Sequence, residues 1–249
     1  MQNNIILQHW NGDMPHWAKL AEKTVRDYCE RIGCHYELLR GHPMGEDWGP
    51  NPQKLAYLLE KYDEYDQTLM IDMDMIATKS SRDVFEVEQV GVIHERAMKD
   101  DGSSLTPDAA RPLYKKGEYI FFGNFIKLHK EQRIKAREHL DKEYIASVLK
   151  DKYAGDETVL SYLLWKSEVL KGKTIEEVCM RCGGTSHKDI HFRKHNRLDR
   201  KFANLSNDSK GDPISGSDKD AVFLHFGQSR KNNIPAAVRE MYGEIYANI

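Results

Sequence analysis

One stretch, Leu69 to Ala77, constrains the fold more than any other part of the chain. Its sequence is Leu-Met-Ile-Asp-Met-Asp-Met-Ile-Ala, so apolar residues lead into Asp72 and Asp74 and then resume. A short apolar run with acids set into it is typical of a buried strand that emerges at a functional site. On a continuous strand, alternation would place the two carboxylates on the same side, about 7 Å apart. The sequence therefore predicts a buried strand that carries a pair of acids.

Asp72 and Asp74 would repel each other on one side of a strand unless a cation lay between them. Oxygen ligands at that separation suit a hard divalent cation such as Mg²⁺ or Mn²⁺. The alternative is a strand that ends early, with both acids solvated in a loop, because bare Asp-x-Asp triplets are common. The stretch alone leaves both interpretations open.

Strands and helices are predicted to alternate along the chain. Apolar periodicity predicts a strand from Asn4 to His9, a helix from Pro15 to Ile32 and a strand from Cys34 to Leu39. The later predicted elements are a helix entered at Asn51-Pro52, a strand at Val90–His94, an apolar segment at Tyr119–Leu128, a charged helix at Lys130–Lys152, a helix after Gly155, a strand at Val222–His225 and a helical tail from Pro235. Strands that alternate with helices predict an α/β fold, with parallel strands in the first β-α-β unit.

The composition of the 249-residue chain excludes several classes of protein. A net charge of −2 gives no overall field that would attract nucleic acid or an anionic membrane, so we expect no nucleic-acid partner. No apolar run approaches the ~20 residues that span a bilayer, and the first residues lack the features of a signal peptide. Four cysteines in a chain of this length do not make a disulfide framework. We therefore expect a cytoplasmic protein with reduced thiols and no membrane span.

The order of the motifs resembles that of the GT-A glycosyltransferases, in particular the retaining group of glycogenin and the bacterial lipopolysaccharide galactosyltransferases. The shared features are a β-α-β start, a helix with an early Lys, a strand ending in Asp-x-Asp, an Asn/Gly turn, a Gly-Asp-Glu helix entry and a late His-Phe followed by Lys. The resemblance implies a GT-A type fold, with a Rossmann-like, mostly parallel central sheet flanked by helices. It also implies a single catalytic domain over 1–249, in which 1–80 form the nucleotide- and metal-binding half and 81–249 the acceptor half with a C-terminal metal and phosphate segment.

The resemblance assigns a metal and phosphate site. Asp72 and Asp74 match the metal-binding acids of the family, and His225 matches its third protein ligand. Lys231, six positions after His225, matches the lysine that holds the diphosphate. The family's glycine three residues after the histidine is replaced here by Gln228, so the turn around the phosphate differs.

The resemblance also assigns residues on the sugar side of the site. Lys54 matches a donor-contacting lysine on the helix before the acids, and Asp156 matches an acid near the transferred sugar. Glu157, beside Asp156, is a second candidate catalytic residue. Asn124 lies where the family has Asn-Ser/Ala-Gly, although the order here is Gly-Asn. Asp156 and Glu157 could instead be ordinary helix-start acids that satisfy free N–H groups.

These assignments imply a metal-dependent glycosyltransferase that moves a sugar from a UDP- or GDP-linked donor to a saccharide, lipid-linked or protein acceptor, with retention of configuration. The physical chemistry agrees, because a divalent cation that bridges two phosphates stabilises the negative charge that grows on the leaving group. A mixed oxygen and nitrogen ligand set suits Mn²⁺ slightly better than Mg²⁺. We expect two polar loops, Asp100 to Pro112 and Ser206 to Asp220, to set the acceptor.

Two other functions compete with this one. The Asp72-x-Asp74 pair also resembles that of haloacid-dehalogenase-like phosphatases, in which the first Asp is a nucleophile and the second a general acid. In that family the motif lies on the first strand, whereas a β-α-β unit precedes it here. The third possibility is a zinc or nucleic-acid-binding module built on the residues Cys179, Cys182, His187, His191 and His195. The near-neutral charge argues against nucleic acid, and a basic flap on the acceptor side is the favoured interpretation of that segment.

Overall fold

The computed structural model describes most of the chain. The described residues are 3–86, 90–93, 121–141, 143, 156–173, 181–182, 185–186, 191–194, 221–226, 228–244 and 246. The loops Asp100 to Pro112 and Ser206 to Asp220 lie outside them, as do Cys179, His187 and His195. The acceptor loops and the zinc site therefore stay predictions.

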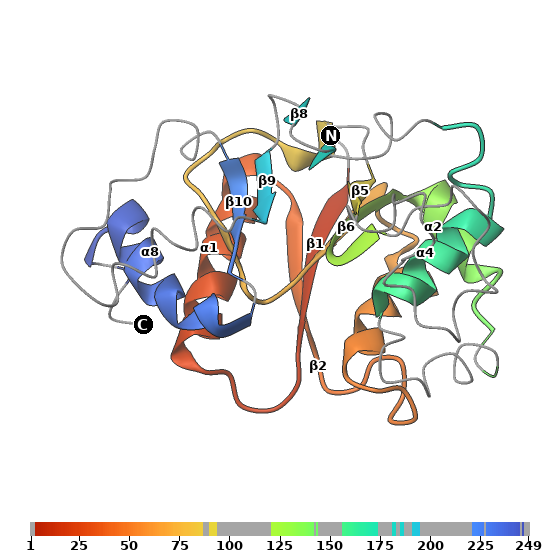
Figure 1. Cartoon of the computed structure of the whole chain (residues 1–249), viewed down its shortest axis with the longest axis horizontal. Helices are drawn as coiled ribbons and strands as arrows, with labels where there is room; N and C mark the ends of the chain where they lie inside the picture. The colour runs from red at the N-terminus through yellow and green to blue at the C-terminus, as the bar shows by residue number, and fades with distance from the viewer. Residues whose placement is uncertain are drawn as a thin grey trace, which may run out of the picture.

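The central sheet has five strands in the order β2-β1-β3-β6-β5 (Figure 1). Strand β1 (Asn4–Trp10) pairs in parallel with β2 (His35–Arg40) on one side and with β3 (Gln67–Ile71) on the other. Strand β6 (Phe121–His129) runs antiparallel to both β3 and β5 (Gly91–Ile93). Four of these five described strands thus share one direction, and the predicted α/β fold with a mostly parallel sheet is confirmed.

The connections around β1 create a switch point in the sheet. The chain leaves β1, crosses through helix α1 (His16–Ile32) to β2, and later returns on the opposite side of β1 as β3. In open α/β sheets, ligands bind outside the carboxyl ends of the strands where the order reverses in this way. The topology therefore directs attention to the residues that follow β1 and β3.

Alternation along the strands supplies an apolar surface on each face of the sheet. On β1, Ile5 and Leu7 contribute to one core cluster and Ile6 to another, all of them buried. The elements packed over the first face are η1 (Asn51–Leu58), η2 (Glu60–Tyr62), α2 (Lys130–Arg137) and α4 (Asp156–Lys166). Helix α1 covers the second face together with the short helix η3 (Val84–Glu86), so helices flank the sheet on both sides (Figure 1).

A second sheet lies beside α1, with the strand order β4-β10-β9 (Figure 1). Its strands are β4 (Met75–Ala77), β10 (Ala221–His225) and β9 (His191–Lys194). After β10 the chain continues through η6 (Gln228–Asn233) into helix α8 (Ile234–Tyr242), whose apolar residues pack against α1. A separate two-stranded pair joins β7 (Arg181–Cys182) to β8 (Thr185–Ser186).

Of the two interpretations left open for Leu69 to Ala77, the structure shows the strand that ends early, with two separate strands on either side of the acids. Strand β3 ends at Ile71, and the next three residues form a turn in which the N–H of Met75 donates to the carbonyl of Asp72 at 3.2 Å. The side chain of Gln8 on β1 donates to the same carbonyl at 3.1 Å and holds the turn against the sheet. The apolar residues that follow the turn enter β4, which belongs to the second sheet.

The predicted charged helix from Lys130 to Lys152 is interrupted, since α2 stops at Arg137 and residues 138–141 are not helical, while 144–152 lie outside the described residues. Its arginines are not on a solvated face. Arg133 is completely buried and donates to the carbonyls of Leu128, Tyr62 and Tyr65. The segment entered at Asn51-Pro52, predicted as one helix, consists of the two 3₁₀ helices η1 and η2. The hydrogen bonds from Arg133 to the carbonyls of Tyr62 and Tyr65 are long-range, and local periodicity does not encode them.

Candidate active site

A pocket of about 300 Å³ opens at the carboxyl ends of β1 and β3, the switch point of the sheet. Its described lining comes from the ends of these strands, from the starts of α1 and η1, and from η6. The lining residues are His9, Trp10, Asn11, Trp17, Pro50, Asn51, Lys54, Asp72, Met73, Asp74 and Lys231. The pocket therefore combines four charged groups of the predicted site, Lys54, Asp72, Asp74 and Lys231, with two tryptophans.

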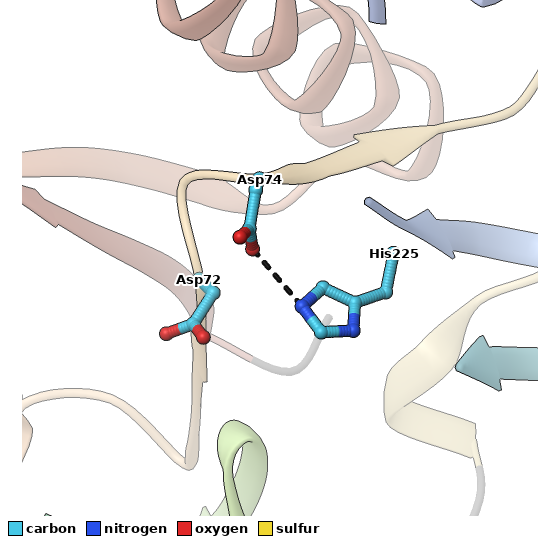
Figure 2. A group of neighbouring side chains, drawn as sticks. All are labelled: Asp72, Asp74 and His225. Atoms are coloured by element: carbon cyan, nitrogen blue, oxygen red, sulfur yellow. Dashed lines mark ion pairs between the residues drawn. The ribbon is translucent and has the colours of Figure 1, made fainter. Parts of the chain in front are cut away.

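Asp72, Asp74 and His225 meet at this end of the sheet (Figure 2). One ligand atom from each residue lies within 4.8 Å of the others. The two acids come from the turn after β3, whereas His225 is the last residue of β10. Antiparallel pairing sets His225 opposite Met75 on β4, and the N–H of Phe226 donates to the carbonyl of Asp74 at 2.8 Å. Strand β10 of the second sheet thus places the imidazole of His225 beside the two acids.

Asp74 lies between two basic side chains. Nε2 of His225 is 3.0 Å from its Oδ1, and Nζ of Lys231 is 3.3 Å from its Oδ2. Burial alone would raise the pKa of Asp74, but the hydrogen bond and charge of His225 and the charge of Lys231 hold the pKa below its ordinary value. Asp74 is therefore a carboxylate, ready to bind a cation.

The residues at this site fit a divalent cation. Oδ1 of Asp74 is fully buried and lies 3.0 Å from Nε2 of His225, so the carboxylate faces the imidazole inside the cluster. Two carboxylates and one imidazole are hard and borderline ligands that suit Mn²⁺ or Mg²⁺, and they leave coordination positions open for other oxygens.

Lys54, in the first turn of η1, forms ion pairs with both Asp72 and Asp156. Its Nζ lies 2.7 Å from Oδ1 of Asp72 and 2.6 Å from Oδ2 of Asp156, and it donates to the carbonyl of Gly123 at 3.1 Å. Burial alone would lower the pKa of Lys54, but the charges of Asp156 and Asp72 raise it above its ordinary value. The ammonium therefore stays charged.

The pKa of Asp72 shifts in the opposite direction from that of Asp74. Burial is the main cause and raises it, and the negative charges of Asp74 and Asp156 add to the rise. Lys54 opposes this rise without cancelling it. The two acids of the motif thus differ. His225 and Lys231 stabilise the charged form of Asp74, whereas the positive charge of Lys54 does not offset the burial of Asp72 and its two acidic neighbours.

Trp17 and Trp10 form an aromatic wall of the pocket. Their rings meet edge to face with centroids 5.4 Å apart, and Nζ of Lys231 lies 5.4 Å from the centroid of Trp17. A cation over a tryptophan ring is attracted by the ring quadrupole, so Trp17 helps to place Lys231 beside Asp74. The sequence pattern predicted the helix that carries Trp17 but did not identify Trp17 as a pocket residue.

The structure brings together five of the eight predicted site residues at the pocket: Lys54, Asp72, Asp74, His225 and Lys231. Asp156 begins α4 and joins this group through Lys54. Glu157 follows it in the first turn of α4, half-buried, and does not belong to the described pocket lining. Asn124 lies in β6, but its side chain is outside what the structure describes. The roles of these last residues stay predictions.

Sequence analysis also missed Gly123 and Gln8. A glycine inside a strand commonly marks a close approach by another group, and that signal was present at Gly123. Gln8, completely buried, accepts a hydrogen bond from Tyr36 and supports the turn of the acids. A polar residue within an apolar strand could have drawn attention to Gln8, but the sequence does not show that it contacts Asp72 and Tyr36.

No family model matches the chain, and no curated protein matches it. Several solved structures of similar fold do match the chain. One is a glycosyltransferase involved in the glycosylation of the major capsid of PBCV-1, with 12% sequence identity, a TM-score of 0.46, and coverage of 94% of this chain and 98% of that chain. Another is the galactosyltransferase LgtC in complex with donor and acceptor sugar analogs, with 15% identity, a TM-score of 0.45, and coverage of 90% and 87%.

An active-site mutant of LgtC is also similar, with 16% identity, a TM-score of 0.48, and coverage of 94% of this chain and 95% of that chain. All three neighbours are glycosyltransferases. Their identities and TM-scores are low, so the function of this chain has to be argued from its own site. Among the helices in the described part of the chain, none is both long and apolar enough to cross a membrane.

Proposed function

We propose that the chain is a metal-dependent glycosyltransferase that uses a nucleotide-diphosphate sugar as donor. One observation carries the proposal: the Asp72, Asp74 and His225 cluster lies at a pocket at the switch point of the sheet, with the ammonium of Lys231 beside it. A divalent cation and an ammonium group at one pocket wall are the groups needed to neutralise a departing diphosphate. The acceptor is a saccharide, a lipid-linked saccharide or a protein.

Each residue has a distinct role in this proposal. Asp72, Asp74 and His225 would hold Mn²⁺ or Mg²⁺, which supplies Lewis-acid stabilisation of the leaving phosphates when bound. Lys231 adds a positive charge from the tryptophan side of the pocket. Lys54 places a second ammonium on the other side of Asp72, where it can contact the sugar or the phosphate that bears it.

The phosphatase alternative is not favoured. A general acid must carry a proton at the working pH, which requires a raised pKa. The second acid of the motif, Asp74, has a lowered pKa because His225 and Lys231 surround it. A nucleophilic Asp72 would also have to leave its ion pair with Lys54.

Binding of the nucleotide is expected to depend on the metal. Asp72 and Asp74 would repel the two phosphates of UDP or GDP, so removing Mn²⁺ should weaken binding by about tenfold or more, or about 1.4 kcal/mol. Isothermal titration calorimetry with each nucleotide, with Mn²⁺ and with EDTA, measures this. The Asp74→Asn variant is the matched control, since it should bind weakly under both conditions. Equal affinity of the wild-type chain in Mn²⁺ and in EDTA would refute the donor site.

The reaction is expected to retain the configuration of the donor sugar. An inverting transferase needs a general base opposite the leaving group. The carboxylates in the described pocket lining are Asp72 and Asp74, the proposed metal ligands, whereas Asp156 is 7% exposed and ion-paired with Lys54. Asp156 is thus better placed to orient groups than to take a proton, and Asp156→Asn should lose only part of the rate.

The coupling constant at the anomeric proton of the product, measured by NMR, identifies the configuration. Glu157→Gln serves as the matched control for Asp156→Asn, because it removes the neighbouring charge of the same helix turn. An inverted product, with either variant inactive, would contradict retention and would leave the metal site unaffected.

A further inference from the structure

Gly123 lies where a side chain would collide with Asp156. A Cβ built on Gly123 would overlap Oδ2 of Asp156, lie 2.8 Å from its Cγ, and lie 3.1 Å from Cγ of Glu157. Gly123 is the third residue of β6, between the buried side chains of Phe121 and Phe125. Asp156 is constrained, because it begins α4 and is 7% exposed. The absence of a side chain at 123 therefore creates the space that the carboxylate fills.

The same glycine also contacts the partner of that carboxylate. Its carbonyl accepts a hydrogen bond from Nζ of Lys54 at 3.1 Å, and Nζ lies 2.6 Å from Oδ2 of Asp156. Gly123 thus leaves the space that the Asp156 carboxylate fills and also accepts a hydrogen bond from the Lys54 ammonium. The third group at Nζ is Oδ1 of Asp72, at 2.7 Å.

Lys54 has one positive charge to share between two carboxylates. Asp72 is a proposed metal ligand, so an ammonium paired with it opposes the binding of a divalent cation. Asp156 is not in the metal cluster, and its charge draws part of the Lys54 interaction away from Asp72. If Asp156 were displaced, Lys54 would pair with Asp72 alone and compete more strongly with the metal.

We infer that Gly123 is a positioning residue that tunes metal affinity: it seats Asp156 against Lys54, and Asp156 in turn limits how strongly Lys54 competes with the cation for Asp72. The inference rests on the metal site of the proposed function. It assigns Asp156 an electrostatic role that operates before any sugar is bound. It also explains why a donor-side lysine can lie so close to a metal ligand without blocking it.

The test is a titration of the whole chain with Mn²⁺ alone, followed by the electron paramagnetic resonance signal of the free ion. Gly123→Ala should weaken Mn²⁺ binding by about threefold or more, within the range of coupling energies of contacting residues. Asp156→Ala should weaken it similarly. In the double variant, Gly123→Ala should add little to the effect of Asp156→Ala, because the carboxylate that it displaces is already gone. A purely structural role of Gly123 would give equal effects in both backgrounds, which would overturn the inference.

Gly91 provides a matched control on the neighbouring strand. A Cβ there would lie 2.7 Å from the carbonyl of Phe125 and 2.9 Å from Cδ1 of Ile126, so Gly91→Ala creates comparable crowding against β6 rather than against Asp156. It should lower the melting temperature without changing Mn²⁺ affinity. Equal weakening of Mn²⁺ binding by Gly91→Ala and Gly123→Ala would refute the specific role of Gly123.

A third variant tests the inference even if Gly123→Ala fails to fold. Lys54→Met removes the competing ammonium and should strengthen Mn²⁺ binding, the opposite direction from Asp156→Ala. Unchanged Mn²⁺ affinity in both variants would overturn the inference while the metal site stands. If the Asp74→Asn variant bound Mn²⁺ as tightly as the wild-type chain, the proposed metal site would be overturned as well. The two failures are therefore distinguishable.

Discussion

The Asp72→Asn variant is expected to lose Mn²⁺ binding and sugar transfer and yet to melt no lower than the metal-free wild-type chain. The pKa of Asp72 is raised, mainly by burial, so its charged form is less stable in the folded chain than in the unfolded one. At neutral pH this penalty lowers the free energy of unfolding, and it is relieved only as the pH falls through the folded-state pKa. An uncharged asparagine removes the penalty, while Lys54 keeps Asp156 as a partner.

Asp74→Asn is expected to abolish the same activity but to destabilise the chain. The pKa of Asp74 is lowered, so its charge stabilises the fold at every pH above the ordinary value of 3.8, and this contribution is lost as the pH falls through the lower folded-state value. The variant leaves His225 and Lys231 without their carboxylate. A loss of about 1 kcal/mol would lower the melting temperature of a chain of this size by about 2–4 °C.

Calorimetric melting at pH 7 in EDTA, followed by melting with Mn²⁺, measures both effects. Mn²⁺ should raise the melting temperature of the wild-type chain and of neither variant, because a ligand stabilises only the fold that binds it. Asp27→Asn is the control, since Asp27 pairs with Lys23 at 3.1 Å on the surface of α1, where an ion pair contributes little. An equal fall in melting temperature for Asp72→Asn and Asp74→Asn would contradict the assigned electrostatics.

Lys231→Ala is expected to lower turnover by about 10²–10³-fold, the usual effect of removing one preorganised charge-stabilising donor. Its side chain is 38% exposed, so the fold should hardly change. The diphosphate gains charge as the sugar leaves, so kcat should fall more than KM rises. His225→Ala should lower turnover strongly as well, but through loss of the metal.

Steady-state kinetics at saturating Mn²⁺ separates these effects. Lys79→Ala is the matched control, because Lys79 also lies over an aromatic ring, 5.5 Å from the centroid of Tyr242, but outside the described pocket lining. Lys231→Arg keeps the charge and should recover part of the rate. A Lys231→Ala enzyme with nearly wild-type turnover would exclude the proposed phosphate contact.

Most of the fold could be predicted from the sequence because its elements are local and strongly periodic. Helix α1 begins after Pro15 and ends at Gly33, whose φ of 73° is a left-handed cap that glycine adopts easily, so the sequence marks both of its ends. The strands on either side were equally clear. The turn between β3 and β4 was not, because apolar residues lie on both sides of the acids and only pairing with β10 shows that the sheet has changed.

The candidate site was predicted in part, and the reason is again the range of the contacts. Asp72 and Asp74 were identified as a pair from the apolar stretch around them, whereas His225 and Lys231 were identified through the resemblance to the GT-A glycosyltransferases. The link from Lys54 to Asp156 and the space at Gly123 depend on three elements that meet only in the folded chain. No pattern in a single sequence reports that a strand glycine faces the first residue of a distant helix.

The division of the metal site between two sheets has a consequence for how the chain is made. Lys54 emerges from the ribosome before Asp72, so that acid has its partner early, whereas His225 and Lys231 are synthesised about 150 residues after Asp74. Strand β10 must pair with β4 before the imidazole reaches the acids. A nascent chain can therefore form much of the central sheet while it still lacks a place for metal or donor. We expect newly made molecules to become competent for binding in one late step, when β10 docks.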